Sequence, residues 1–200
     1  WRSIRLTLLA SGACLMLVPL LALASGVLGW QPKGPALFLP WLLINLGITC
    51  LAEELIFRGL LQRALVGRFG AVAGIGLATA LFGAAHLPAG FGFTGLATLA
   101  GLGYGLAFHY SGDRLWVAVL LHGAVNSLHL LLLTYPLTRS GLLAGKFLGH
   151  GLILALSTAL GFGIAAVLIV LLAEQATFAN LAGPFGLFIL SAILLGWCFL

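Results

Sequence analysis

Acidic side chains are scarce in this sequence, which has four Asp and Glu among its 200 residues and only 6% charged residues in total. Soluble domains carry about a quarter charged residues, so the composition excludes an ordinary soluble enzyme. Hydrophobic residues make up 62% of the chain, in repeated apolar runs of roughly 17–25 residues that are each long enough to cross a bilayer. The sequence therefore predicts one all-α, polytopic transmembrane domain over residues 1–200, with no soluble domain attached.

Several kinds of site are also absent from the sequence. The net charge of +5 comes from Arg and Lys near predicted helix ends, which suits an anionic membrane surface, and no basic face is dense enough to bind nucleic acid. The cysteines lie in separate apolar runs without metal-type spacing, so no disulfide framework is implied. They are Cys14, Cys50 and Cys198. The chain has no GxSG, GxGD or HExxH pattern, which argues against the intramembrane proteases that depend on serine, aspartate or zinc.

The apolar runs fit about seven membrane spans. Two prolines and a glycine between residues 31 and 35 cannot continue a helix, and residues 67–70 contain two glycines at a predicted turn. The predicted helices cover residues 6–28, 36–66, 71–87, 93–110, 115–135, 149–173 and 178–200.

The basic residues of the short loops predict the orientation in the membrane. A cytoplasmic N-terminus places five arginines on the cytoplasmic side, namely Arg2, Arg5, Arg63, Arg68 and Arg114. It places three basic residues on the opposite side, namely Lys33, Arg139 and Lys146. Because positive charge is enriched on the cytoplasmic side, a cytoplasmic N-terminus is predicted.

Two of the four acidic residues, Glu53 and Glu54, are neighbours inside an apolar run. A carboxylate in hydrocarbon costs several kcal/mol unless it is paired or reached by water. Residues four apart share a helix face, so Glu54 and Arg58 are expected to form a structural ion pair. Glu53 points about 100° away and has no such partner, which makes it the better candidate for a catalytic carboxylate. The alternative is that Glu53 is a spare residue beside a structural Glu–Arg pair.

A second motif contains Phe82 and His86, which share a helix face. In isolation, a histidine near a helix end is more often a packing residue than a catalytic one. If the helices on either side of Phe69 form a hairpin, however, Glu53 and His86 lie at nearly the same depth, where they could flank one water molecule.

A third motif places His122 and Asn126 on one face of the helix predicted over residues 115–135. Two polar groups stacked inside a span suggest a functional site, although hydrogen bonding between helices is the alternative role. His122 is closer to its own loop than His86 is to its loop. The motifs therefore meet only if the Arg63 and Arg68 end of the hairpin projects past the membrane.

These residue types suit the hydrolysis of an amide by an activated water. Glu53 is the predicted general base and His86 helps to hold or activate the water. His122 and Asn126 are predicted to donate hydrogen bonds to the oxyanion. The alternative is a zinc site with Glu53, His86 and His122 as ligands and an open position for water. The apolar surroundings favour a reaction without a cofactor.

The motifs EExxxR, FxxxH and HxxxN, in this order on separate spans, resemble the CPBP or Abi family of CAAX-processing and bacteriocin-processing intramembrane proteases. All three are intact within about residues 40–130, and their conserved positions are Glu53, Glu54, Arg58, Phe82, His86, His122 and Asn126. The resemblance implies a helical membrane fold with a cavity open to one side, and cleavage of a membrane-associated or C-terminal peptide segment. It also implies that Glu53, His86, His122 and Asn126 are the catalytic set. Both metal-dependent and metal-free mechanisms have been attributed to this family.

The chain is short for that family and has few helices before the first motif. This favours a compact member in the inner membrane of a prokaryote, which cuts a sorting signal or a peptide precursor, over an enzyme for prenylated substrates. The predicted partners are thus a peptide or protein substrate and the lipid bilayer. The alternative function is a non-catalytic immunity or scaffold protein that binds a partner peptide or helix. A proton-coupled transporter would also use Glu and His within the membrane, but it predicts an internal symmetry that the sequence lacks.

Overall fold

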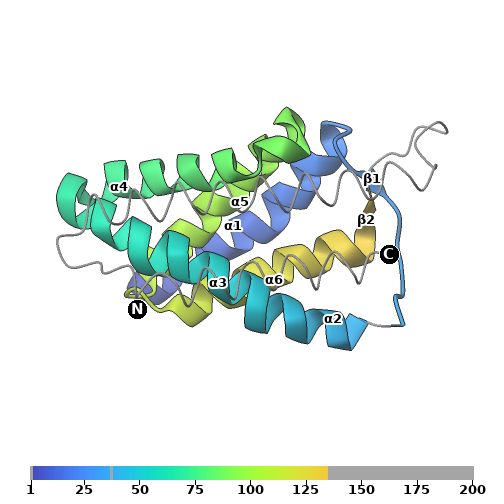
Figure 1. Ribbon diagram of the computed structural model, residues 1–200, viewed down its shortest axis with the longest axis horizontal. Coiled ribbons are helices and arrows are strands. Elements are labelled where there is room, and N and C mark those ends of the chain that lie inside the picture. Colours follow the sequence, from blue (N-terminus) through green and yellow to red (C-terminus); the bar gives the residue numbers. More distant parts are fainter. Residues whose placement is uncertain (1, 37, 135–200) are drawn as a thin grey trace.

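The structure is a computed structural model that describes residues 2–36 and 38–134, and these residues are mainly helical (Figure 1). The elements in chain order are α1 (Arg2–Ala24), β1 (Gly29–Trp30), α2 (Phe38–Ile44), the π-helix η1 (Asn45–Cys50), α3 (Leu51–Glu54), the π-helix η2 (Leu55–Gln62), α4 (Arg63–Ala85), the 3-10 helix η3 (Leu87–Ala89), α5 (Phe91–Tyr110), α6 (Leu115–Leu132) and β2 (Leu133–Thr134).

Four helices in this part of the chain are long and apolar enough to cross a membrane. They are Arg2–Ala24, Phe38–Ala85, Phe91–Tyr110 and Leu115–Leu132. The predicted helical character is confirmed for the first five spans. The spans predicted over 149–173 and 178–200 lie outside the described residues, so the total of seven stays a prediction.

The longest helical segment, Phe38–Ala85, is bent into a hairpin at the predicted turn. Gly70 has φ 80° and ψ 168°, a conformation that a residue without a side chain adopts at little cost. Beyond it, Gly74 lies so close to the first arm that a Cβ there would be 2.7 Å from the backbone carbon of Leu65. The second half of α4 therefore returns along η2, and the two helices are in contact.

The core is built around α5, which packs against α1, α4 and α6. Small residues of α5 allow this close approach, since a Cβ on Gly103 would lie 2.6 Å from Cys14 Cβ on α1. Polar and charged side chains are also buried here, namely Asn45, Glu53, Glu54, Arg58, Gln62, Thr79 and His122. Such groups are costly to bury without partners, so the contacts of these side chains indicate the position of a candidate functional site.

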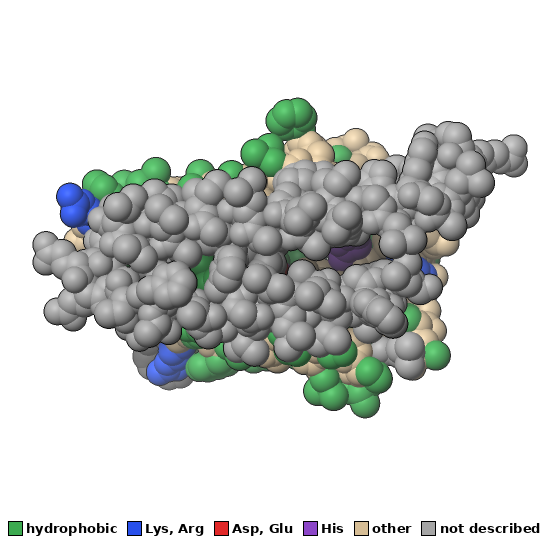
Figure 2. Space-filling model, viewed as in Figure 1, with side chains coloured by type: hydrophobic (Ala, Val, Ile, Leu, Met, Phe, Trp, Pro, Cys, Tyr) green, Lys and Arg blue, Asp and Glu red, His purple; other side chains and the backbone are tan. Residues whose placement is uncertain are grey.

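The outside of the molecule is apolar, as expected for a surface in contact with lipid. Leu8 and Leu9 of α1 are 66% and 68% exposed. In Figure 2 the described side chains on the visible face are largely hydrophobic, and Lys and Arg side chains gather at the ends of the molecule. This distribution suits a helix bundle whose middle is in hydrocarbon.

A short strand pair, which the sequence analysis did not predict, joins the end of α1 to the end of α6. β1 and β2 are antiparallel, with Gly29 opposite Thr134 and Trp30 opposite Leu133. The Lys33 ammonium donates to the Leu133 carbonyl at 2.7 Å. The loop after α1 is thereby held against the end of α6.

Candidate active site

The predicted ion pair between Glu54 and Arg58 is present and completely buried. Arg58 Nε lies 3.1 Å from Glu54 Oε2, and the two side chains are 1% and 0% exposed. Arg58 Nη2 donates to the carbonyl of Gly101 at 2.8 Å, and the guanidinium lies 4.4 Å from the centroid of the Phe82 ring. A cation–π contact of this kind is strongest where water is excluded. The charge on Arg58 is thus compensated by a carboxylate, a carbonyl and an aromatic face.

One helical turn further on, Gln62 repeats the contact that Arg58 makes with α5. Gln62 Nε2 donates to the carbonyl of Gly105 at 2.9 Å. A Cβ on Gly105 would lie 2.7 Å from Gln62 Oε1. Gly101 and Gly105, which have no side chains, therefore leave space for Arg58 and Gln62 of η2 to reach the backbone of α5.

His122 connects this buried ion pair to the second glutamate. Its Nδ1 lies 2.8 Å from Glu54 Oε1, and its Nε2 lies 3.9 Å from Glu53 Oε2. A carboxylate paired with Arg58 accepts hydrogen bonds, so His122 Nδ1 carries the proton that it donates to Glu54. The opposite nitrogen, Nε2, is then the one that faces Glu53. The contact between Glu54 and His122 was not predicted from the sequence.

Glu53 is 6% exposed, and its Oε2 has no hydrogen-bond partner among the described residues. Glu53, Glu54, Arg58 and His122 together contain two carboxyl groups and one permanent cation. A buried group of charges is least costly when it is neutral overall. Neutrality requires one proton to be held by Glu53 or by His122 Nε2.

His86 is held at the end of α4 by its own helix. Its Nδ1 lies 2.8 Å from the carbonyl oxygen of Phe82, and its ring centroid lies 4.8 Å from that of Phe82. A carbonyl only accepts, so Nδ1 of His86 is the protonated nitrogen. In the neutral imidazole this leaves a lone pair on Nε2, which is the form of histidine that can act as a base.

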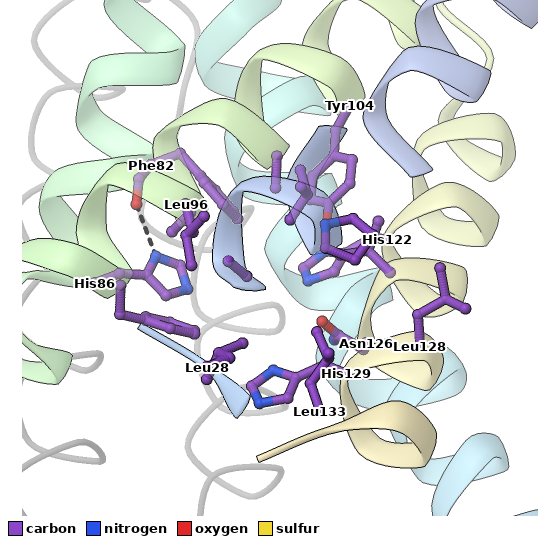
Figure 3. A pocket seen from close by; sticks show the side chains of 17 residues that line it. Leu28, Phe82, His86, Leu96, Tyr104, His122, Asn126, Leu128, His129 and Leu133 are labelled. Atoms are coloured by element: carbon purple, nitrogen blue, oxygen red, sulfur yellow. Dashed lines mark hydrogen bonds between the residues drawn. The ribbon is translucent and has the colours of Figure 1, made fainter. Parts of the chain in front are cut away.

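Three of the four predicted catalytic residues line one cavity of about 70 Å³: His86, His122 and Asn126 (Figure 3). A polar cavity of this size is large enough to admit water. His129 also lies on its wall. Within the described part of the chain, Glu53 is not on the wall, and it reaches the cavity through His122. The prediction that one water lies between Glu53 and His86 stays a prediction.

The depths of the motifs agree because the hairpin projects beyond the loop before α6. Arg63 Nη2 donates to the carbonyl of Asp113 at 2.9 Å, so the two residues are level. Glu54 lies nine residues from Arg63, as His122 lies from Asp113. The segment between Arg63 and Gly70 therefore extends past this loop, while its projection beyond the membrane stays a prediction.

Asn126 contacts two residues that the sequence analysis did not select, Asn45 and Cys50. Its Nδ2 lies 3.3 Å from Asn45 Oδ1 and 3.6 Å from Cys50 Sγ. Gly123, one turn earlier on α6, packs directly against Leu46 of η1, in a space that a Cβ would fill. The α6 and η1 backbones thus approach closely enough for their polar side chains to meet.

The proposed zinc ligands do not converge in this arrangement. No group of three His, Cys, Asp or Glu side chains among residues 2–36 and 38–134 is placed to hold a metal ion. Glu53 and His122 are close to one another, whereas the Nδ1 of His86 is bonded to the carbonyl of Phe82. The residues therefore do not fit a three-ligand zinc site, and no step through a metal is derived from them.

Comparison with known proteins identifies the segment that carries these contacts. The family model described as Type II CAAX prenyl endopeptidase Rce1-like matches residues 35–128. Residues 35–128 are therefore similar to the CAAX-protease family. This matched segment contains Asn45 and Cys50 in addition to all three sequence motifs.

A different family is matched by the end of the chain. The model described as ABC-2 family transporter protein matches residues 126–200, so the two matches meet at the last turns of α6. The chain is also similar to two proteins named "Probable ABC transporter permease protein NosY", at 56% identity over 71 residues for Stutzerimonas stutzeri and 61% over 71 residues for Pseudomonas aeruginosa. Each alignment covers 36% of this chain, which spans only 26% of the length of either relative. No solved structure matches the chain significantly. That residues 1–200 form a single protease domain stays a prediction.

Proposed function

We propose that this chain is an intramembrane endopeptidase that hydrolyses a peptide bond in a membrane-associated or C-terminal segment of its substrate. The observation that carries the proposal is the cavity shared by His86, His122 and Asn126, with Glu53 Oε2 3.9 Å from His122 Nε2. The match of residues 35–128 to the CAAX-protease family supports the same chemistry.

The attacking water lies in the cavity, where the lone pair on His86 Nε2 takes its proton as the water oxygen bonds to the carbonyl carbon. The carbonyl oxygen becomes an oxyanion, which accepts hydrogen bonds from His122 Nε2 and Asn126 Nδ2. Cleavage of the carbon–nitrogen bond then passes the proton from His86 to the leaving amine. The products are a carboxylic acid and an amine, which become a carboxylate and an ammonium group when the acid proton passes to the amine.

Glu53 acts in this scheme through the proton that it shares with His122. While Glu53 is ionised, His122 holds protons on both nitrogens and can donate from Nε2. Glu53 becomes the direct base, as the sequence suggests, if water reaches its Oε2. Both roles need the carboxylate, because an amide at this position neither accepts a proton nor stabilises an imidazolium.

Three variants test the proposal by mass spectrometry of membrane-anchored peptide libraries, with the purified chain in proteoliposomes. Glu53→Gln and His86→Ala are expected to lower cleavage by at least about 100-fold, the lower end of the range for acid–base groups, while thermal unfolding stays close to wild type. His109→Ala is the matched control for His86→Ala, because His109 lies on α5 away from this cavity. Full cleavage by Glu53→Gln would refute the role of this carboxylate.

A second candidate function is a non-catalytic membrane role in which the chain binds a partner peptide or helix. The match of residues 126–200 to the ABC-2 transporter family, and the relatives named as permeases, favour this alternative. In that case Glu53→Gln and His86→Ala leave partner binding unchanged, and the wild-type chain releases no cleaved product from the library.

A further inference from the structure

The π-helix η1 brings together two polar side chains that an α-helix would keep apart. Asn45 and Cys50 are five residues apart, which in an α-helix corresponds to about 140° around the axis. In η1 their side chains meet, and Cys50 Sγ donates to Asn45 Oδ1 at 3.2 Å. π-helical turns of this kind occur frequently at functional sites.

Both residues are buried beneath the cavity residue Asn126. Asn45 is 4% exposed and Cys50 is 0% exposed, and neither lines the cavity within the described chain. Asn45 Oδ1 accepts from Asn126 Nδ2 at 3.3 Å as well as from the thiol. The amide oxygen of Asn45 is therefore a fixed acceptor that holds the Asn126 side chain from behind.

This contact leaves one hydrogen of Asn126 Nδ2 for the substrate. Asn45 Oδ1 and Cys50 Sγ lie only 3.2 Å apart, so both are on the same side of Asn126 Nδ2, at 3.3 and 3.6 Å. The second hydrogen of the planar amide is directed away from this pair. It is therefore the one that can donate a charge-assisted hydrogen bond to an oxyanion.

We propose that Asn45, held by Cys50 across one π-helical turn, is a positioning residue that fixes the amide of Asn126 for transition-state stabilisation. The inference rests on the proposed function and adds a residue outside the EExxxR, FxxxH and HxxxN motifs. Asn45 acts only through Asn126. Its loss therefore lowers kcat and leaves substrate binding nearly unchanged, because the oxyanion forms only during the reaction.

A double-mutant cycle tests this inference on the full-length chain, with Asn45→Leu and Asn126→Ala alone and combined. Asn126→Ala is expected to lower kcat by about 100- to 1,000-fold, as for loss of one oxyanion donor. Asn45→Leu is expected to lower kcat by about 10-fold or more with KM changed by less than about 2-fold. The double variant is expected to match Asn126→Ala, because residues that act as a unit are not additive. Independent, multiplicative losses in the double variant would overturn the inference.

Two further variants separate positioning from a general effect on the π-helix. Thr49→Val removes a buried hydroxyl of η1 that has no hydrogen-bond partner among the described residues, and kcat is expected to stay within about 2-fold of wild type. Cys50→Val removes the thiol that holds Asn45, so kcat is expected to fall in the same direction as in Asn45→Leu. If Asn45→Leu does not fold, Cys50→Val takes its place in the double-mutant cycle with Asn126→Ala. Equal losses of kcat in Thr49→Val and Cys50→Val would show a general structural effect on η1 and would refute the inference.

The same cycle, measured by thermal unfolding, distinguishes failure of this inference from failure of the proposed function. If the wild-type chain cleaves no peptide, the proposed function fails. Non-additive shifts in the unfolding temperature would then still support the contact between Asn45 and Asn126, whereas additive shifts would refute it.

Discussion

At the scale of single residues, Glu54 has two partners where the helical spacing suggested one. It pairs with Arg58 and also bonds His122 at 2.8 Å. The ion pair therefore does more than neutralise a buried arginine, because it also determines which nitrogen of His122 carries a proton. A carboxylate beside a catalytic histidine commonly has this orienting role.

Loss of Arg58 is expected to harm folding as much as chemistry. Arg58→Ala leaves Glu54 buried with His122 as its remaining partner, and removal of one member of a buried ion pair costs about 3–5 kcal/mol. The free energy of unfolding, measured in detergent or bicelles, checks this value. Arg68→Ala is the control, because Arg68 is exposed in the segment before Gly70 and should change stability by less than about 0.5 kcal/mol. A stable but inactive Arg58→Ala would move Arg58 from a structural to a functional role.

Contacts that were predicted from the sequence join residues at α-helical spacing, whereas the contacts that were not predicted join residues at other spacings or on different helices. Glu54 with Arg58, and Phe82 with His86, are four apart, so α-helical geometry was sufficient to predict their contacts. Asn45 and Cys50 were missed because their spacing of five becomes a contact only in a π-helix, which has no recognised sequence signal. Tyr104 was missed because its stacking on His122, with centroids 4.7 Å apart, joins two different helices.

At the scale of elements, the hairpin of Phe38–Ala85 determines where His86 lies relative to Glu54. The turn was predictable, because glycines at positions 67 and 70 interrupt an otherwise continuous helical pattern. The strand pair was not predictable, because two residues are too short to show an alternating pattern. The interruptions by η1 and η2 were also invisible in a sequence that reads as one continuous helix.

Two glycines of α4 provide a matched test of the hairpin. A Cβ at Gly74 would collide with the backbone of Leu65 and Val66, whereas a Cβ at Gly76 meets nothing within 4 Å. Gly74→Ala is therefore expected to destabilise the protein by about 1–3 kcal/mol through overpacking. Gly76→Ala is expected to be neutral or stabilising by up to about 1 kcal/mol, because alanine is the better helix former. Equal unfolding free energies for the two variants would contradict the close approach of the two arms.

At the scale of the whole molecule, the structure brings the predicted cytoplasmic residues of the described chain to one end. The Ser3 hydroxyl donates to the carbonyl of Tyr110, and Arg63 contacts Asp113. Lys33 lies at the opposite end, beside Leu133. The structure thus confirms that these basic residues are grouped as predicted, while the side of the membrane on which each group lies stays a prediction.

Cysteine labelling in intact cells tests this orientation. Gln31→Cys and Ser111→Cys, in a chain that also carries Cys198→Ser, place one accessible thiol at either end, because Cys14 and Cys50 are buried. A membrane-impermeant maleimide is expected to label Gln31→Cys in intact cells and Ser111→Cys only after permeabilisation. The reverse pattern would place the N-terminus outside.

The strand pair also has a mechanical consequence for the cavity. Leu28 and Leu133 both belong to the cavity wall. Leu133 is paired with Trp30, and Leu28 directly precedes Gly29, which is paired with Thr134. A force on the chain beyond Thr134 would act on this wall before it reached the helix bundle. Since the matched family changes at residues 126–128, this wall lies next to the boundary between the two matched segments.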